Sequence, residues 1–168
     1  MINIVLYEPE IPTNTGNIMR TCVGIGAKLH LIEPLGFSLD EKSVKRSGAN
    51  YIDKLNYEVY KNYEDFLSKN NGEFYYFTRY GKKPHSSFDY SDNSKDIYLI
   101  FGKESAGIPK EILKGNLDRC MRIPMTEDLR SLNLSNCVAI VAYEVLRQQN
   151  YNDLLRVEPH KGENYLEE

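Results

Sequence analysis

The chain has 168 residues, 41% of them apolar and 27% charged, a composition typical of one globular domain with a single core. Its formal net charge of −3 gives no overall signal for a nucleic-acid partner. No stretch approaches the ~18 apolar residues of a membrane helix, and the first residues lack the basic segment of a secretion signal, so we expect a cytoplasmic protein. Cys22, Cys120 and Cys137 are widely spaced in apolar segments, which favours buried reduced thiols over disulfides or a zinc site.

The first thirty residues predict a β-α-β unit. Residues 2–7 and 29–32 are short apolar runs typical of buried strands. Between them we expect a helix from Gly16 to Val23, capped by the side chain of Asn14 or Thr15 and stopped at Gly24 or Gly26. A short helical crossover of this kind places its two strands in parallel.

Strands and helices alternate along the rest of the chain. Further helices are expected at residues 39–47, 63–69 and 108–113 and from Ser135 onward, and further strands at 56–60, 73–78, 97–101 and 120–123. This alternation predicts an α/β fold with a mostly parallel sheet. The polar segment 79–96 is long for a connection, which indicates a functional loop.

The helix expected at residues 136–146 is apolar on almost every side. A helix of that kind is buried on all sides. A chain of this length rarely surrounds its last helix alone, so we expect part of the helix surface to contact a second subunit.

The charged residues are distributed unevenly. Residues 151–168 hold the whole net charge of −3, so we expect a domain at 1–155 and an acidic, mobile tail at 156–168. The neutral remainder has two basic clusters, at 42–46 and 79–83. Such clusters are usually solvated surface, and they are also the candidates for contacts to phosphate groups.

Three predicted strand ends lead into distinctive loops, at residues 12–20, 102–107 and 123–133. Ligands bind beyond the carboxyl ends of strands in open parallel sheets, so three such loops would form one site. A dinucleotide site is the first alternative, because Glu33 stands where a ribose-binding acid would. The glycines after the first strand do not form the required G-x-G-x-x-G pattern, which disfavours that alternative.

These loops resemble the three signature motifs of the SPOUT RNA methyltransferases. The matching stretches are NTGNIMR at 14–20, FGKESAG at 101–107, and IPM at 123–125 followed by RSLNLS at 130–135. The opening IVLYEPEIPTNTGNIMR and the lack of an added RNA-binding domain look most like the small TrmL type, which methylates the ribose of the tRNA wobble nucleotide. Thr13 and Lys103 depart from the residues common at those positions and bear mainly on substrate preference.

The resemblance implies an α/β fold with helices on both faces and a C-terminal trefoil knot, a homodimer, and S-adenosylmethionine bound at the knot. It implies a tRNA substrate, methylated at the 2′-oxygen of a wobble cytidine or modified uridine, and neither a metal nor a membrane. Alternatives are another 2′-O-methylation site in tRNA or ribosomal RNA, an idle RNA-binding module, and, more distantly, an oxidoreductase.

The resemblance also assigns site residues. Those implied to contact the cofactor are Phe77, Gly102, Ile123, Ser131, Leu132 and Leu134. Those implied in catalysis are Arg20, Ser131 and Asn17. Those implied to bind the substrate are Asn14, Arg20, Lys45, Arg46, Lys82 and Arg130. Ile123 and Leu132 could equally be core residues, and Ser131 and Asn133 could equally serve helix entry.

Arg20 is the residue that we expect to matter most for the chemistry. A ribose hydroxyl is a very weak acid, and an arginine essentially never gives up its proton in a protein. We therefore expect Arg20 to position the phosphate and stabilise the developing alkoxide rather than act as a base. Glu104 is expected to organise its loop by accepting N–H bonds. His85 could lie near the substrate, but we expect it to be exposed, and a lone exposed histidine usually has no role.

Overall fold

The computed structural model describes residues 1–40, 42, 44, 46 and 49–168. Within this part of the chain a single seven-stranded sheet has the order β3-β2-β1-β6-β4-β7-β5, and every strand pair is parallel. The strands are β1 (Ile2–Tyr7), β2 (Lys28–Ile32), β3 (Tyr57–Tyr60), β4 (Glu73–Phe77), β5 (Lys83–Pro84), β6 (Ile97–Phe101) and β7 (Cys120–Arg122). The α/β class and parallel sheet predicted from the sequence are thus confirmed.

Helices lie on both faces of the sheet, as expected. The α-helices are α1 (Pro12–Ile25), α3 (Tyr63–Lys69), α4 (Lys110–Lys114) and α5 (Leu134–Gln148), and the 3₁₀ helices are η1 (Ala49–Lys54), η2 (Leu117–Arg119) and η3 (Tyr165–Glu167). The helix expected at 39–47 falls largely outside the described residues, of which Lys42, Val44 and Arg46 are helical.

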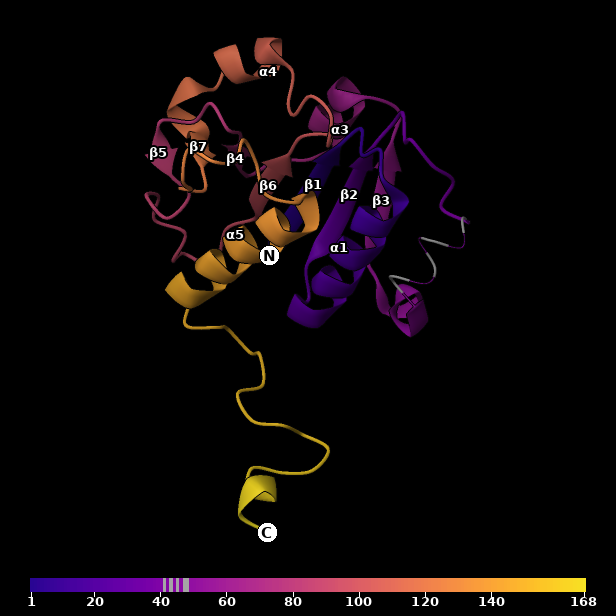
Figure 1. Cartoon of the computed structure of the whole chain (residues 1–168), viewed down its shortest axis with the longest axis vertical. Coiled ribbons are helices and arrows are strands. Elements are labelled where there is room, and N and C mark those ends of the chain that lie inside the picture. Colours follow the sequence, from indigo (N-terminus) through magenta and orange to yellow (C-terminus); the bar gives the residue numbers. More distant parts are fainter. Residues whose placement is uncertain (41, 43, 45, 47–48) are drawn as a thin grey trace.

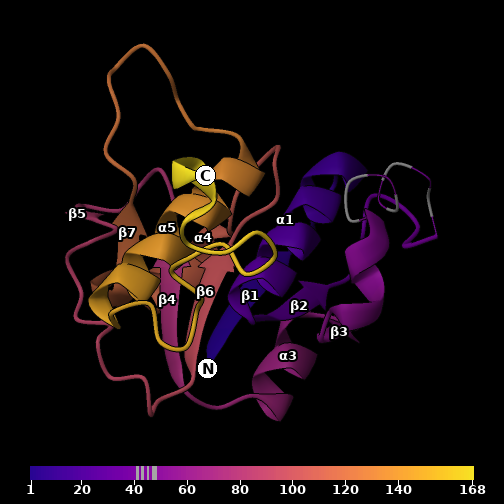
Figure 2. The ribbon, with the colours of Figure 1, turned by 90° about the horizontal axis from the view of Figure 1, so that it is seen from below.

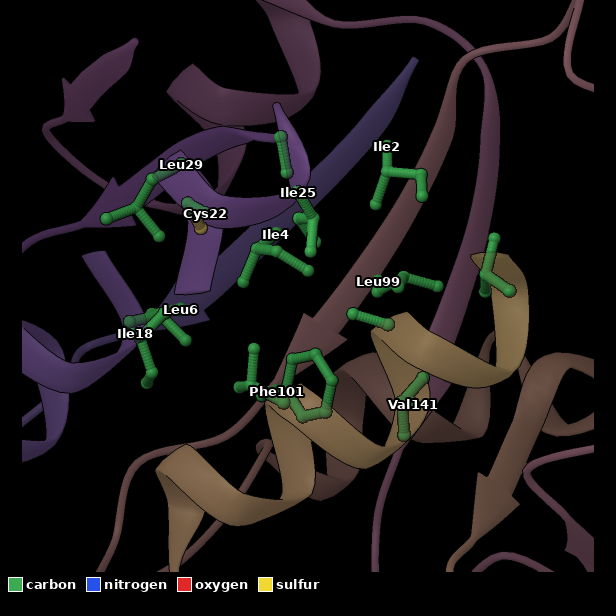
Figure 3. Packing of buried hydrophobic residues seen from close by; sticks show 14 of the residues in the cluster. Ile2, Ile4, Leu6, Ile18, Cys22, Ile25, Leu29, Leu99, Phe101 and Val141 are labelled. Carbon is green, nitrogen blue, oxygen red and sulfur yellow. The ribbon is translucent and has the colours of Figure 1, made fainter. Parts of the chain in front are cut away.

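Two apolar cores, one on each side of the sheet, hold these layers together. In the larger core, α1 and α5 lie side by side over the middle strands (Figure 1). Ile18 and Cys22 of α1 lie beside Leu6 of β1 and Leu29 of β2, and Val141 of α5 lies near Leu99 and Phe101 of β6 (Figure 3). The smaller core places α3 and α4 on the opposite face, around Phe66 and Leu113. Because β6 is covered on both faces, its five residues are all buried, which explains its continuous apolar sequence.

The start of α1 differs from the prediction. The helix begins at Pro12 with Ile11 as its N-cap, and no side chain caps it, so the expected caps Asn14 and Thr15 lie inside its first turn. Proline is favoured at the first helical position because the N–H that it lacks would have no partner within the helix. The predicted end is confirmed, since Gly26 adopts the left-handed conformation with φ 69°.

Helix α5 is not buried on all sides within one chain, which corrects the prediction from its composition. One face, with Val138, Val141 and Val145, is fully buried against the sheet. On the other face Ile140 is 39% exposed and Tyr143 is 48% exposed. The apolar outer face leaves the expected contact with a second subunit as a prediction, and the trefoil knot likewise stays a prediction from the family resemblance.

A polar network lies inside the sheet on the β1-β2-β3 side. His30 is completely buried, with Nε2 2.8 Å from Oδ1 of Asn3 and Nδ1 2.7 Å from the hydroxyl of Tyr60. That hydroxyl also donates to Glu58 at 2.6 Å. Burial is the main reason that the pKa of His30 is lowered to about 4, and the charge of Lys28 adds to the effect. Burial thus favours the neutral imidazole, which carries a proton on only one ring nitrogen.

The C-terminal segment extends away from the domain after α5 (Figure 1). Residues 155–168 are all exposed and include the one-turn helix η3. The domain boundary at residue 155 and the mobility of the tail remain predictions.

Candidate active site

Of the three stretches singled out from the sequence, 12–20 lies within α1 rather than in a loop, so the first loop is the shorter stretch 8–11 between β1 and α1. This first loop, the start of α1, and the loops after β6 and β7 meet at the carboxyl ends of β1, β4, β6 and β7. They enclose a cleft of about 590 Å³, called here the loop cleft. Its lining includes Ile11 from the first loop, Asn14 from the start of α1, residues 102–107 from the second loop, and residues 130–134, where the third loop enters α5. The third loop, which follows β7, arches away from the sheet before it enters α5 (Figure 2). The expectation of a single site at this edge of the sheet is met.

Gly102 is required by the fold of its own loop. The chain turns back so tightly after β6 that a Cβ at Gly102 would lie 2.1 Å from the carbonyl carbon of Gly107. The turn is closed by a hydrogen bond from the Gly107 N–H to the Lys103 carbonyl at 2.8 Å, with Gly107 at φ 69°. Gly102 lines the loop cleft as predicted, but the close approach that it permits is between two parts of the protein backbone.

Glu104 joins the second loop to the first. Its carboxylate accepts hydrogen bonds from the backbone N–H groups of Glu10 at 2.9 Å and Ile11 at 2.8 Å, and from the side-chain amide of Asn14 at 3.2 Å. The carboxylate thus lies at the N-terminus of α1, where the helix dipole favours a negative charge. The expectation that Glu104 organises the loops is confirmed.

The same chain of hydrogen bonds continues into the third loop. Oδ1 of Asn14 accepts from the side-chain amide of Asn133 at 3.0 Å. Oδ1 of Asn133 in turn accepts from the N–H of Ser135 at 2.9 Å and caps α5. Asn133 therefore serves helix entry, one of the two roles left open by the sequence. The path Glu104–Asn14–Asn133 links all three loops through side chains.

Two further polar contacts reinforce the junction of the first and second loops. The carboxylate of Glu10 accepts from the N–H of Ser105 at 2.8 Å, which lowers the pKa of Glu10. Lys103 lies 3.5 Å from the carboxylate of Glu8. Lys103 therefore has a structural ion pair in this chain, at a position where the family resemblance led us to expect proline.

The inner wall of the loop cleft is apolar. The rings of Phe77 and Phe101 stack with their centroids 5.1 Å apart and their planes at 17°. The apolar residues that continue this wall are Ile123, Leu132, Leu134 and Cys137. Cys137 is only half-buried, unlike the other two cysteines, and burial still raises the pKa of its thiol. A thiol held in this protonated form is a weak nucleophile, so Cys137 serves as part of the wall.

The predicted site residues divide into two groups. Those that line the loop cleft are Asn14, Phe77, Gly102, Ile123, Arg130, Ser131, Leu132 and Leu134. Those outside its lining are Asn17, Arg20, Arg46 and Lys82, all of them exposed. Lys45 lies outside the residues that the structure describes.

Arg20 lies on the exposed surface of α1, six residues beyond Asn14. Six residues of helix amount to about 9 Å along its axis. Within one chain the guanidinium is therefore not among the groups that line the loop cleft. The structure of one chain therefore does not place Arg20 among the residues that line the predicted cofactor site.

Several cleft residues were missed by the sequence motifs. The main ones are Thr78, Arg79 and Tyr80 after β4, and Arg122 at the end of β7. A signal for them did exist, because they follow or end strands whose carboxyl ends point to the same edge as the motif loops. Thr78, Tyr80 and Arg122 belong to none of the three motif stretches, whereas Arg79 is part of the basic cluster 79–83 that the sequence offered for phosphate contacts.

The polar segment 79–96 has two different roles. Its first residues line the loop cleft, whereas its later part is fastened to α5. The side chain of Gln148 accepts from the N–H of Tyr90 at 2.7 Å and donates to the carbonyl of Phe88 at 3.1 Å, and the Tyr90 ring is buried. His85 is half-buried rather than exposed as expected, and burial lowers its pKa. The segment is thus only partly a functional loop.

Two features are absent from the described part of the chain. No group of three or more histidine, cysteine or acidic side chains is arranged to hold a metal ion among those residues. Among the same residues, no helix has the length and apolar character needed to span a bilayer.

Comparison with known proteins relates this chain to RNA methyltransferases. A family model described as SpoU rRNA methylase matches residues 1–143. A Bacillus subtilis protein provisionally named tRNA (cytidine(34)-2′-O)-methyltransferase is 51% identical over 154 residues, which cover 91% of this chain and 96% of that protein. The Escherichia coli K12 protein named tRNA (cytidine(34)-2′-O)-methyltransferase is 44% identical over 153 residues, or 90% of this chain and 96% of that protein.

Solved structures give the same picture. A protein from Bacillus anthracis, provisionally described as an RNA methyltransferase, superposes with a TM-score of 0.88 at 52% identity and covers 94% of this chain and 100% of that one. A structure described as giving insight into 2-OH methylation of C/U34 on tRNA has a TM-score of 0.83 at 36% identity, covering 90% and 98%. An AdoMet-bound rRNA methyltransferase from Sinorhizobium meliloti has a TM-score of 0.77 at 25% identity, covering 87% and 56%.

Proposed function

The chain belongs to the SpoU rRNA methylase family, and from that premise we propose that it methylates the ribose 2′-hydroxyl of the wobble nucleotide of tRNA. The methyl donor is S-adenosylmethionine, and the target is cytidine or a modified uridine at the first anticodon position. Two near-full-length relatives named for cytidine 34 support this substrate, as does the similarity to a structure concerned with C/U34. A tRNA substrate also implies that the protein works in the cytoplasm.

One structural observation carries the assignment of the cofactor site. The hydrogen-bonded path Glu104–Asn14–Asn133 joins the three motif loops around a single cleft. Its volume of about 590 Å³ lies within the range of roughly 300–1,000 Å³ usual for small-molecule sites.

The chemistry of the lining fits S-adenosylmethionine. The apolar wall formed by Phe77, Leu132 and Leu134 suits an adenine ring, and the backbone groups of the second loop suit its polar edge. Ser131 offers a polar side chain at the rim for one end of the ligand, and Arg130 beside it remains available to the RNA. When bound, the cofactor supplies a methyl group on a positively charged sulfur, which makes that carbon a good electrophile.

The residues of the chain then have to align the ribose oxygen with that carbon and exclude competing nucleophiles. The rigid loop junction keeps the lining in one geometry, so little reorganisation is needed when the RNA arrives. We assign Arg20 to the phosphate beside the target ribose, where its guanidinium also stabilises the developing alkoxide.

We propose that the active unit is a homodimer and that Arg20 acts on the cleft of the other copy. Two observations support this arrangement. Arg20 is outside the lining of the loop cleft in its own chain, and the apolar outer face of α5 exposes Ile140 and Tyr143. A second copy packed against the outer face of α5 would cover Ile140 and Tyr143. Such packing could also place Arg20 of one copy beside the loop cleft of the other.

The experiment that tests the function is a methyl-transfer assay with mapping of the product. The purified protein is given methyl-labelled S-adenosylmethionine and bulk tRNA from cells that lack this enzyme. We expect the label in a 2′-O-methylribose at the first anticodon position. A label elsewhere in the tRNA would keep the chemistry and overturn the substrate. Absence of label from a protein that still binds the cofactor would favour a different RNA or an idle binding module.

A further inference from the structure

Tyr80 is a large aromatic residue left almost entirely in solvent beside the loop cleft. It is 71% exposed, the largest exposed fraction of any aromatic residue whose burial the structure describes. It follows β4, in a four-residue turn closed by a hydrogen bond from the Gly81 N–H to the Thr78 carbonyl at 3.1 Å. The Tyr80 N–H is itself bonded to the Thr78 hydroxyl at 3.2 Å. The ring is therefore displayed on a structured turn.

The turn is anchored to the sheet rather than free to fold inward. The Thr78 N–H donates to the carbonyl of Met121 in β7 at 2.9 Å. A Cβ at Gly81 would lie 2.4 Å from the carbonyl carbon of Met121, so the turn contacts β7 backbone to backbone. This close fit holds Tyr80 at the edge of the loop cleft at little entropic cost upon binding.

Two arginine side chains lie at this turn. The guanidinium carbon of Arg79 lies 5.2 Å from the Tyr80 ring centroid, within the range of a cation–π contact. Nη1 of Arg122 donates to the carbonyl of Arg79 at 3.3 Å and so ties that guanidinium to the same turn. The exposed surface at this point combines a flat aromatic face with positive charge.

A second hollow of about 580 Å³ adjoins the loop cleft here and is called the arginine hollow. It shares with the cleft Arg79, Tyr80, Arg122, Met125 and Arg130. Its other lining residues are Thr126, Glu127 and Leu129. Three arginines against one glutamate give this hollow a positive balance, in a chain whose net charge is −3. Positive charge is thus gathered in the arginine hollow, beside the loop cleft.

We propose that Tyr80 is a stacking platform for the RNA base next to the methylated nucleotide, with Arg79, Arg122 and Arg130 contacting the phosphates on either side. Single-stranded RNA is commonly held by such a pairing of aromatic faces with arginine side chains. The shared lining means that a nucleotide whose ribose reaches the loop cleft has its neighbour in the arginine hollow. This inference rests on the proposed RNA-methylating function and names the part of the RNA that the site holds.

An experiment on base stacking separates this role from a structural one. Anticodon stem-loop RNAs carry the fluorescent base 2-aminopurine on one side or the other of the target nucleotide. They are titrated with the wild type, Tyr80→Phe and Tyr80→Leu. We expect the wild type and Tyr80→Phe to quench the fluorescence at one of these positions, because both offer an aromatic face, and Tyr80→Leu to fail to quench it. The KM for the RNA should rise by roughly 5- to 100-fold in Tyr80→Leu.

Two controls keep the result interpretable. The urea unfolding midpoint should be the same in all three proteins, because the exposed Tyr80 side chain contributes little to the core. Tyr57→Leu removes a tyrosine that is 43% exposed on β3 and lines neither hollow, so it should leave both quenching and KM unchanged.

Failure of this proposal is distinguishable from failure of the proposed function. Quenching by Tyr80→Leu equal to that of the wild type, or no quenching by the wild type at either position, would overturn the platform even if tRNA is methylated. If the wild type transfers no methyl group to the RNA, the proposed function fails, whereas quenching that depends on the aromatic ring would still support an RNA-stacking surface.

Discussion

Replacement of Glu104 by glutamine tests whether the loop junction determines cofactor binding. The two residues have nearly the same shape, but an amide has only one accepting oxygen. In the native protein one carboxylate oxygen accepts from Glu10, and the other accepts from Ile11 and Asn14. In Glu104→Gln the NH₂ group must face at least one of these N–H donors, so at least one hydrogen bond is lost and two donors are brought together.

The expected size of the effect follows from those contacts. A hydrogen bond to a charged group contributes about 1.5–3 kcal/mol to stability. Glu104 is half-buried, so water compensates part of the loss, and we expect a destabilisation of about 1–2 kcal/mol. At a urea m-value of about 2 kcal/mol/M this lowers the unfolding midpoint by roughly 0.5–1 M. Because the lost bonds join the loops rather than the core, S-adenosylmethionine affinity should fall by roughly 10-fold.

Urea denaturation and calorimetric titration of the cofactor measure the two effects. Glu163→Gln is the matched control, because it makes the same charge change on the exposed C-terminal segment. A double-mutant cycle with Asn14→Ala should show a coupling of about 0.5–1 kcal/mol, since the two side chains are in direct contact. If Glu104→Gln matched the Glu163→Gln control in both unfolding midpoint and cofactor affinity, the view that this junction shapes the cleft would be wrong.

Three further predictions concern the dimer, the RNA and pH. In a mixed dimer one copy carries Arg20→Ala and the other carries Leu132→Glu; it should have about half of the wild-type activity, because one complete site still forms across the two copies. A dimer of a wild-type copy with a copy that carries both changes should be inactive. The opposite pattern would place Arg20 and the cleft of one site in the same chain. Binding of tRNA, followed by filter binding, should weaken steeply between low and physiological salt, because arginine contacts to phosphates release counterions, and a flat dependence would refute those contacts. The contribution of His30 to the free energy of unfolding should be fully present above about pH 6.5 and should fall by up to about 3 kcal/mol as the pH drops to about 4. The reason is that the pKa of His30 is lowered to about 4 in the folded protein, so in this range only the unfolded chain binds a proton there. Urea midpoints of His30→Gln should lack this part of the pH dependence, and parallel pH profiles for the two proteins would contradict it.

The regular elements could be predicted because their signals are local. The continuous apolar run of β6 and the pattern of α3 gave the bounds found in the structure, and Gly26 marked the end of α1. These features depend on side-chain periodicity and on backbone preferences within a few residues. The start of α1 was predicted wrongly for a related reason. Asparagine commonly caps helices, but the side chain of Asn14 instead bonds Glu104 and Asn133, about 90 and 119 residues away in the chain.

By itself the sequence determined the α/β class, the order of the elements and, through its motifs, the resemblance to a methyltransferase family. Only the tertiary structure decided which side chains share the site, because the strand order places β6 between β1 and β4 and thereby brings loops distant in sequence to one edge. It put Arg20 outside the cleft of its own chain and brought Arg79 and Tyr80, which no motif marked, to its rim. Local patterns specify an element and its faces, whereas the meeting of distant loops depends on how the whole sheet is assembled, and no short stretch of sequence contains that information.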